Sequence, residues 1–109
     1  MHETAFENAQ KFVQKYNARH KKVLDVGSYD VNGTLKPLFA NYTGMDIEAG
    51  KNVDVISELG QPFPFKDKSF DVVVSSSCLE HDPAFWVTVK EMMRVSKELI
   101  GDDYKNYKR

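Results

Sequence analysis

Hydrophobic residues recur with two different periods along this chain. From Thr4 to about Ala18 the apolar side chains have helical spacing, which predicts one amphipathic helix. Short apolar runs between turn residues predict strands at residues 23–26, 42–47, 53–56 and 70–74. Pro37 fits only the first turn of a short helix within residues 34–39. A second long helix is predicted from Pro83, capped by Asp82, with an apolar face of Phe85, Trp86, Val89, Met92 and Met93.

The run from Phe70 to Val74 is the best strand signal in the chain, because its valines follow one another without polar alternation. Such a strand is buried on both faces, as in a parallel sheet that helices cover. Strands that are joined by crossovers form right-handed connections and a doubly wound layer. The order of elements therefore predicts an α/β fold with a parallel sheet, formed as a single domain by residues 1–109.

Composition excludes several classes of protein. Hydrophobic residues make up 41% and charged residues 28% of the chain, which is ordinary for a soluble globular domain. The net charge of -1 gives no strong nucleic-acid signal. The lone cysteine, Cys78, excludes an internal disulfide and a multi-cysteine metal site, and no metal is predicted. No signal peptide and no apolar run of about 20 residues is visible, so we expect no membrane association and a cytoplasmic location.

The first candidate site is the turn after the first strand, VLDVGSYDVNG. A strand that ends at Gly27 and turns toward a helix presents free backbone N–H groups, which suit a ligand carboxylate or phosphate. Tyr29 stands where the motif G-x-G-x-x-G has its second glycine, and this argues against NAD or FAD. An ordinary strand-to-helix turn is the alternative interpretation.

Acidic residues follow the second and third strands. Asp46 comes about 20 residues after the glycine turn, where doubly wound folds place a carboxylate that accepts hydrogen bonds from ribose hydroxyls. A surface aspartate in a turn is the alternative. Glu58 is a candidate acceptor for the exocyclic amine of an adenine, and Leu59 a candidate for packing on the ring. By itself, Glu58 is equally well explained as a solvated glutamate.

The residues after the fourth strand, Ser75–Asp82, are expected to line the carboxyl ends of the strands, where open α/β sheets bind ligands. His81 and Glu80 are candidate proton carriers. A hydrogen bond at the end of the following helix explains His81 equally well. Cys78 is not favoured as a nucleophile, because the sequence shows no residue that would activate it.

Taken together, the glycine turn, residues 42–82 and the segment EMMRVSK resemble class I S-adenosylmethionine-dependent methyltransferases over about residues 20–97. The resemblance implies a Rossmann-like sheet with strand order 3-2-1-4 and S-adenosyl-L-methionine as cofactor. It implies that Asp25 and Gly27 hold the methionine end, that Asp46 takes the ribose hydroxyls, and that Ser28 and Ile47 also bind the cofactor. Glu58 and Leu59 would hold the adenine, Ser75 would lie beneath the sulfonium, and His81 would be a base toward the acceptor.

The chain departs from the family after Lys97, where the usual proline and glycines are replaced by ELIGDDYKNYKR. We therefore expect a truncated domain that lacks strand five and the closing hairpin. Strand four would then have an open edge, which favours self-association through that edge. Leu99 and Ile100 folding back as a short cover is the alternative.

Two functions remain open at this point. The first is a methyltransferase whose acceptor is unknown, and the second is a non-catalytic S-adenosylmethionine-binding module or degenerate methyltransferase fragment. The missing substrate-side strands favour the second more than usual. A nicotinamide-dependent oxidoreductase is disfavoured by the absent G-x-G-x-x-G.

Overall fold

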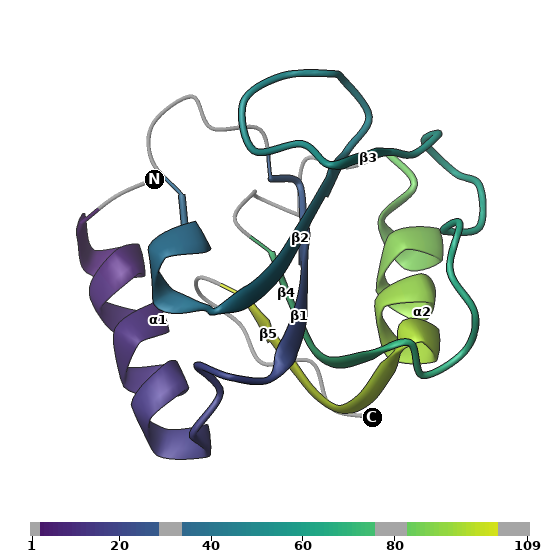
Figure 1. Cartoon of the computed structure of the whole chain (residues 1–109). Helices are drawn as coiled ribbons and strands as arrows, with labels where there is room; N and C mark the ends of the chain where they lie inside the picture. The colour runs from purple at the N-terminus through teal and green to yellow at the C-terminus, as the bar shows by residue number, and fades with distance from the viewer. Residues whose placement is uncertain (1–2, 29–33, 76–82, 103–109) are drawn as a thin grey trace.

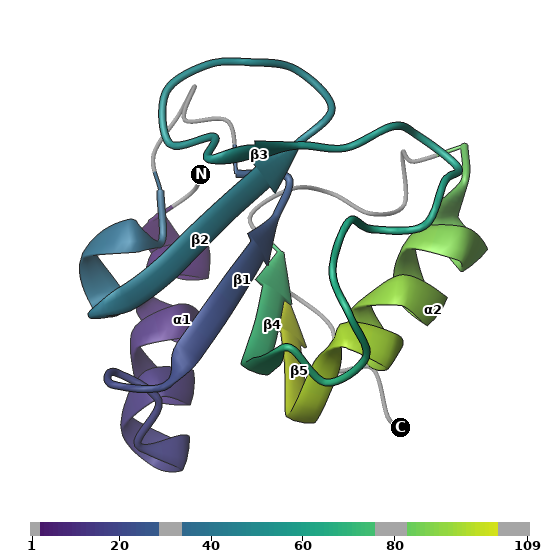
Figure 2. The same cartoon turned by 45° about the vertical axis from the view of Figure 1, so that its right-hand side comes forward.

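The computed structural model describes residues 3–28, 34–75 and 83–102, which form a parallel sheet between two helical layers (Figure 1). The sheet has five strands in the order β3-β2-β1-β4-β5 (Figure 2). The predicted Rossmann-like α/β fold and its order 3-2-1-4 are confirmed, with a fifth strand beside β4. The elements are α1 (Glu3–Tyr16), β1 (Lys22–Val26), the 3-10 helix η1 (Lys36–Leu38), β2 (Asn41–Asp46), β3 (Val55–Ile56), β4 (Phe70–Ser75), α2 (Phe85–Val95) and β5 (Ser96–Asp102).

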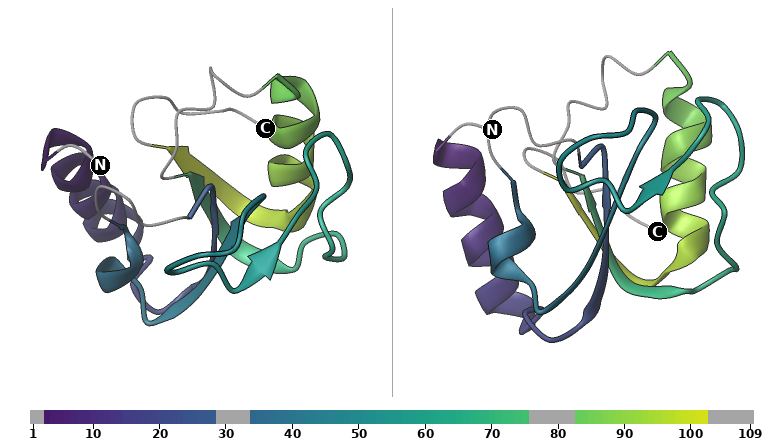
Figure 3. Two further views of the ribbon diagram at one scale, coloured as in Figure 1. Left: turned by 90° about the horizontal axis from the view of Figure 1, so that it is seen from above. Right: turned by 45° about the horizontal axis from the view of Figure 1, so that its top comes forward.

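Helices cover both faces of the sheet, as Figure 3 shows from above. Side chains alternate between the two faces of a strand, so β1 sends Leu24 to one side and Val23 to the other. One face packs on α2 through Val89, Met92 and Val95. The opposite face packs on α1 and on the residues around η1, which include Leu35 and Phe39. Apolar burial on both faces explains why β4 lacks polar alternation.

The first helix ends at Tyr16, two residues before the predicted end at Ala18. Asn17 takes a left-handed φ of 52°, and the amide of Ala18 donates to the carbonyl of Val13 over 3.0 Å. This bond, with that from the Asn17 amide to Gln14, forms a Schellman motif, in which asparagine is the usual substitute for glycine. The turn then leads the chain into β1.

The second helix differs from its prediction at both ends. It begins at Phe85 rather than Pro83, and its N-cap residue Ala84 makes no side-chain capping bond. Asp82, the predicted cap, lies outside the described residues. The helix ends at Val95 because Ser96 is already extended and starts β5. Trp86, placed on the apolar face by its spacing, is 72% exposed instead.

The prediction that strand five is absent is wrong. β5 follows α2 directly and pairs in parallel with β4 from Ser96 to Asp102, so Leu99 and Ile100 lie opposite Val72 and Val73. The prediction rests on the absence of the usual proline and glycines after the helix, whereas backbone pairing needs only extended residues. The open edge of β4, on which the expectation of self-association rested, is therefore occupied. Self-association itself stays a prediction.

A bulge in β5 lies beside Asp71 of β4, where one residue of β4 stands opposite two of β5. The carboxylate of Asp71 accepts the amide of Lys22 over 2.9 Å and pairs with Nζ of Lys97 over 3.4 Å. These hydrogen bonds hold the pKa of Asp71 below its usual value, the Lys22 amide being the largest cause. One carboxylate thus joins the amino ends of β1, β4 and β5.

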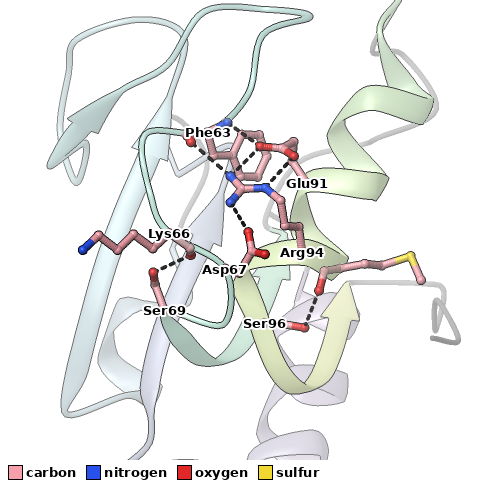
Figure 4. Close-up of polar contacts among 8 residues, drawn as sticks. Phe63, Lys66, Asp67, Ser69, Glu91, Arg94 and Ser96 are labelled. Carbon is pink, nitrogen blue, oxygen red and sulfur yellow. Dashed lines mark hydrogen bonds and ion pairs between the residues drawn. The ribbon is translucent and has the colours of Figure 1, made fainter.

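The connection from β3 to β4 is fixed to α2 by Arg94 (Figure 4). Its guanidinium makes bonds to Glu91 over 2.7 and 2.8 Å, to Asp67 over 2.8 Å and to the carbonyl of Phe63 over 3.2 Å. Glu91 also accepts the amide of Phe63 over 2.6 Å. The arrangement satisfies both backbone groups of Phe63, whose ring is buried in the core beneath α2.

This cluster predicts an acid-sensitive contribution to stability. The bond from Arg94 lowers the pKa of Glu91 from its ordinary value of 4.5, more than burial raises it. A depressed carboxylate pKa stabilises the fold above the unfolded pKa, and this stabilisation is lost as pH falls through the folded pKa. Glu91→Gln should lower the free energy of unfolding at neutral pH by about 1–2 kcal/mol. The free energy of unfolding of Glu91→Gln should also depend less on pH below about 5 than that of the wild type.

Denaturant unfolding of the wild type and Glu91→Gln across acidic and neutral pH measures both effects. Glu7→Gln is the matched control, because Glu7 is an exposed glutamate on α1. It should leave the pH dependence of unfolding as in the wild type. If the free energy of unfolding changed equally with acidic pH in Glu91→Gln and the wild type, the role of this carboxylate would be contradicted.

Candidate functional site

Gly27 and Asp46 lie together at the carboxyl edge of the sheet. β1 and β2 pair with Val26 opposite Met45, so Gly27, the first residue after β1, lies beside Asp46, the last residue of β2. Gly27 has a left-handed φ of 80°, which favours glycine and turns the chain out of β1. The two predicted site residues are thus neighbours, as the sequence spacing implied.

The backbone N–H groups at the start of this turn are not directed toward a ligand. The amides of Gly27 and Ser28 both donate to the carbonyl of Met45, over 2.8 and 3.1 Å. The prediction of free donors is therefore wrong for these two positions, because β2 uses them to hold the turn. Residues 29–33, which include Tyr29, lie outside the described residues.

A close junction lies behind the turn, around Gly44 of β2. A Cβ added to Gly44 would lie 2.0 Å from the carbonyl oxygen of Asn52 and 2.6 Å from Oγ of Ser28. The hydroxyl of Ser28 donates to that same Asn52 carbonyl over 2.8 Å. Ser28 is only 2% exposed, so its side chain fastens the turn to the loop after β2.

Asp46 ends β2 and joins it to β3. Its Oδ1 accepts the amide of Ile47 over 2.7 Å, and its carbonyl accepts the amide of Ser57 over 2.9 Å. The second bond brings the residues after β3 beside Asp46, and Glu58 is exposed there. Large apolar side chains are also exposed near this end of the sheet, namely Ile47 at 50%, Ile56 at 58% and Leu59 at 46%. A carboxylate with exposed apolar neighbours suits a ligand that has both hydroxyls and a flat apolar ring.

Asp25 lies one layer deeper than the turn. It is 0% exposed, and its Oδ2 accepts the hydroxyl of Tyr42 over 2.6 Å. Burial, followed by the negative charge of Asp25, raises the pKa of Tyr42 well above its ordinary value. The phenol therefore stays protonated and donates to the carboxylate. In this arrangement Asp25 braces β1 against β2, and its contact with a ligand stays a prediction.

Ser75 is also buried, at 0% exposed, at the end of β4. Its hydroxyl donates to the carbonyl of Val26 over 2.9 Å and so ties the ends of β4 and β1. The other predicted residues of this segment, including Cys78, Glu80 and His81, lie outside the described residues. Of the predicted residues, the structure brings these to the carboxyl edge: Asp25, Gly27, Ser28, Asp46, Ile47, Glu58, Leu59 and Ser75.

Sequence reasoning missed Tyr42, Gly44, Asn52 and Asp54, which hold this edge together. One signal was visible, because an isolated glycine within a strand often marks the close approach of another backbone. Tyr42 had no such signal, since it looks like any aromatic residue of a half-buried strand. Among the described residues, no His, Cys, Asp or Glu side chains gather in threes as a metal ion would require. The same part of the chain holds no helix both long and apolar enough to span a bilayer.

A doubly wound parallel sheet with a glycine turn and an acidic residue at its carboxyl edge defines a nucleotide-binding α/β domain. The methyltransferase-domain family has a model that matches residues 24–98, and the chain belongs to this family. A comparison with curated proteins finds no match.

Solved structures support the fold. A candidate S-adenosyl-L-methionine-dependent methyltransferase of Methanococcus maripaludis has a TM-score of 0.63 at 13% identity, covering 91% of this chain and 55% of its own. A candidate methyltransferase of Bacillus halodurans has a TM-score of 0.61 at 23% identity, covering 84% and 47%. The methyltransferase CalH, solved in complex with SAH, has a TM-score of 0.55 at 15% identity, covering 84% and 36%. The chain thus spans about half the length of the first two structures.

Proposed function

We propose that this chain binds S-adenosyl-L-methionine at the carboxyl edge of its sheet and acts as a methyltransferase. The observation that carries the proposal is the position of Asp46, which lies beside the Gly27 turn with exposed Ile47 next to it. Membership of the methyltransferase-domain family supports the same conclusion. The methyl acceptor is not specified by any of these residues.

The described residues fit this cofactor by their chemistry. The carboxylate of Asp46 accepts the Ile47 amide through Oδ1, and a carboxylate is a suitable acceptor for the hydrogen bonds of ribose hydroxyls. Ile47 and Leu59 offer exposed apolar surface to an adenine ring, and Glu58 an acceptor for its amine. Because Gly27 has no side chain, the methionine end of the cofactor can come close to the backbone there.

When bound, S-adenosyl-L-methionine supplies a methyl group on a positively charged sulfur. The protein's main task is then to orient the reactants, because an in-line displacement gains most from proximity and alignment. Ser28 and Ser75 serve this task indirectly, since each ties the floor of the site to a neighbouring backbone. His81 as a base toward a hydroxyl or amine acceptor stays a prediction, as does a cytoplasmic location.

Binding of S-adenosylhomocysteine tests the proposal. Calorimetric titration of the full chain should give saturable binding of S-adenosylhomocysteine, with no heat from NAD at the same concentrations. Discrimination is expected because Tyr29 replaces the glycine that a pyrophosphate needs. Equal binding of both ligands, or binding of NAD alone, would contradict the proposed function.

A non-catalytic S-adenosylmethionine-binding module is the second candidate. The observation that favours it is that the residues gathered at the carboxyl edge are the ones proposed to hold the cofactor, whereas no described residue is assigned to an acceptor. Transfer of label from methyl-labelled cofactor to a panel of acceptors separates the two candidates. Cofactor binding without transfer to any acceptor would favour the binding module.

A further inference from the structure

The loop between β2 and β3, residues 47–54, is fastened to the proposed site by Asp54. The amide of Gly44 donates to Oδ2 of Asp54 over 2.8 Å, and the amide of Asp54 donates to the carbonyl of Gly44 over 2.8 Å. β3 begins at Val55, opposite Met45, so Asp54 extends the pairing by one position. Its carboxylate takes the place of the backbone acceptor that a further strand residue would offer to Gly44.

The same loop holds the glycine turn. Asn52 has a left-handed φ of 66°, which asparagine tolerates better than most residues. Its carbonyl accepts the hydroxyl of Ser28 over 2.8 Å. The short segment 52–54 is therefore hydrogen-bonded to the turn at Asn52 and to β2 at Asp54, where Gly44 lies two residues before Asp46.

We propose that Asp54 is a positioning residue that sets the placement of the Gly27 turn relative to Asp46. This inference rests on the proposed function, in which the turn holds the methionine end of the cofactor and Asp46 holds the ribose. Asp54 itself would contact neither half of the cofactor. Its bond to Gly44 keeps the loop, and with it the carbonyl that holds Ser28, at a fixed position over β2.

The proposed site has two halves, the Gly27 turn for the methionine end and Asp46 for the ribose, and ligands of different size can test them separately. Adenosine engages only the Asp46 half, whereas S-adenosylhomocysteine must engage both halves at once. Loss of the Asp54 bond leaves each half intact but loosens their relative placement, so only the larger ligand should lose affinity. A general loss of folding would weaken both ligands to the same extent.

The experiment measures the dissociation constants of S-adenosylhomocysteine by calorimetry and of adenosine by ligand-observed NMR. We expect Asp54→Ala to weaken S-adenosylhomocysteine by about tenfold, equal to about 1.4 kcal/mol, and adenosine by less than about twofold. Asp54→Asn, which retains an oxygen for the Gly44 amide, should restore affinity to within about threefold of the wild type. Thermal unfolding checks that each variant is folded, and Asp54→Ser replaces Asp54→Ala if the latter does not fold.

Each outcome can be assigned to one of the two proposals. Failure of the wild type to bind S-adenosylhomocysteine would overturn the proposed function. Wild-type binding with an unchanged Asp54→Ala affinity would overturn the positioning role alone. An equal loss for both ligands, or no rescue by Asp54→Asn, would also overturn it, because either result indicates a purely structural residue.

Discussion

Replacing Gly44 with alanine is expected to destabilise the domain by about 3 kcal/mol, at the upper end of the usual cost of overpacking. The added methyl carbon would lie 2.0 Å from the carbonyl oxygen of Asn52, a backbone atom that no rotamer change can move away. Oγ and Cβ of Ser28 lie at 2.6 and 2.9 Å, so the turn would have to shift as well. Thermal unfolding should show a midpoint lower by roughly 10–15 °C.

Gly50→Ala is the matched control for this substitution. Gly50 is exposed in the same loop and is not among the glycines with positive φ. An alanine there should be neutral or stabilise slightly, because it restricts the unfolded chain without a clash. A Gly44→Ala variant that unfolds at the same temperature as Gly50→Ala would contradict the close packing of β2 against Asn52.

Much of the fold could be predicted from the sequence because its signals are local. The valine run of β4 indicates burial on both faces whatever its neighbours are, and the spacing of apolar residues in α1 needs no tertiary information. β5 could not be predicted in the same way. It starts directly after Val95 with no loop, and its pairing to β4 is a long-range backbone interaction with no required side chain.

The site residues likewise fall into those that the sequence predicts and those that depend on long-range contacts. Gly27 and Asp46 could be placed together, because their spacing matches adjacent strand ends in a doubly wound fold. The residues that hold them could not, since the bonds of Ser28 to Asn52 and of Gly44 to Asp54 depend on how one loop folds back. The prediction that Trp86 is buried was wrong for a related reason. Helical spacing shows on which side of a helix a residue lies, but not how far the core extends across that side.

The largest effect on ligand binding is expected from Asp46→Ala, which should weaken S-adenosylhomocysteine by about 100-fold. This corresponds to about 2.7 kcal/mol, the usual size for hydrogen bonds to a charged group. The change removes the proposed acceptor of the ribose hydroxyls while the backbone bonds of Gly27 to Met45 and of Ser57 to Asp46 remain possible. Calorimetry measures the affinity, and thermal unfolding of Asp46→Ala checks that the variant is folded.

Two controls, a neighbouring acidic residue and a ligand that lacks one ribose hydroxyl, show whether the loss of affinity comes from the ribose. Glu48→Gln removes one negative charge two residues away on the same loop, where Glu48 is exposed, and should change the affinity by less than about twofold. In the wild type, 2′-deoxyadenosine should bind more weakly than adenosine, and in Asp46→Ala this difference should vanish. The double comparison isolates the bond between the carboxylate and the hydroxyl from any general effect of the substitution. A preference for adenosine that persists in Asp46→Ala would place the ribose away from the end of β2.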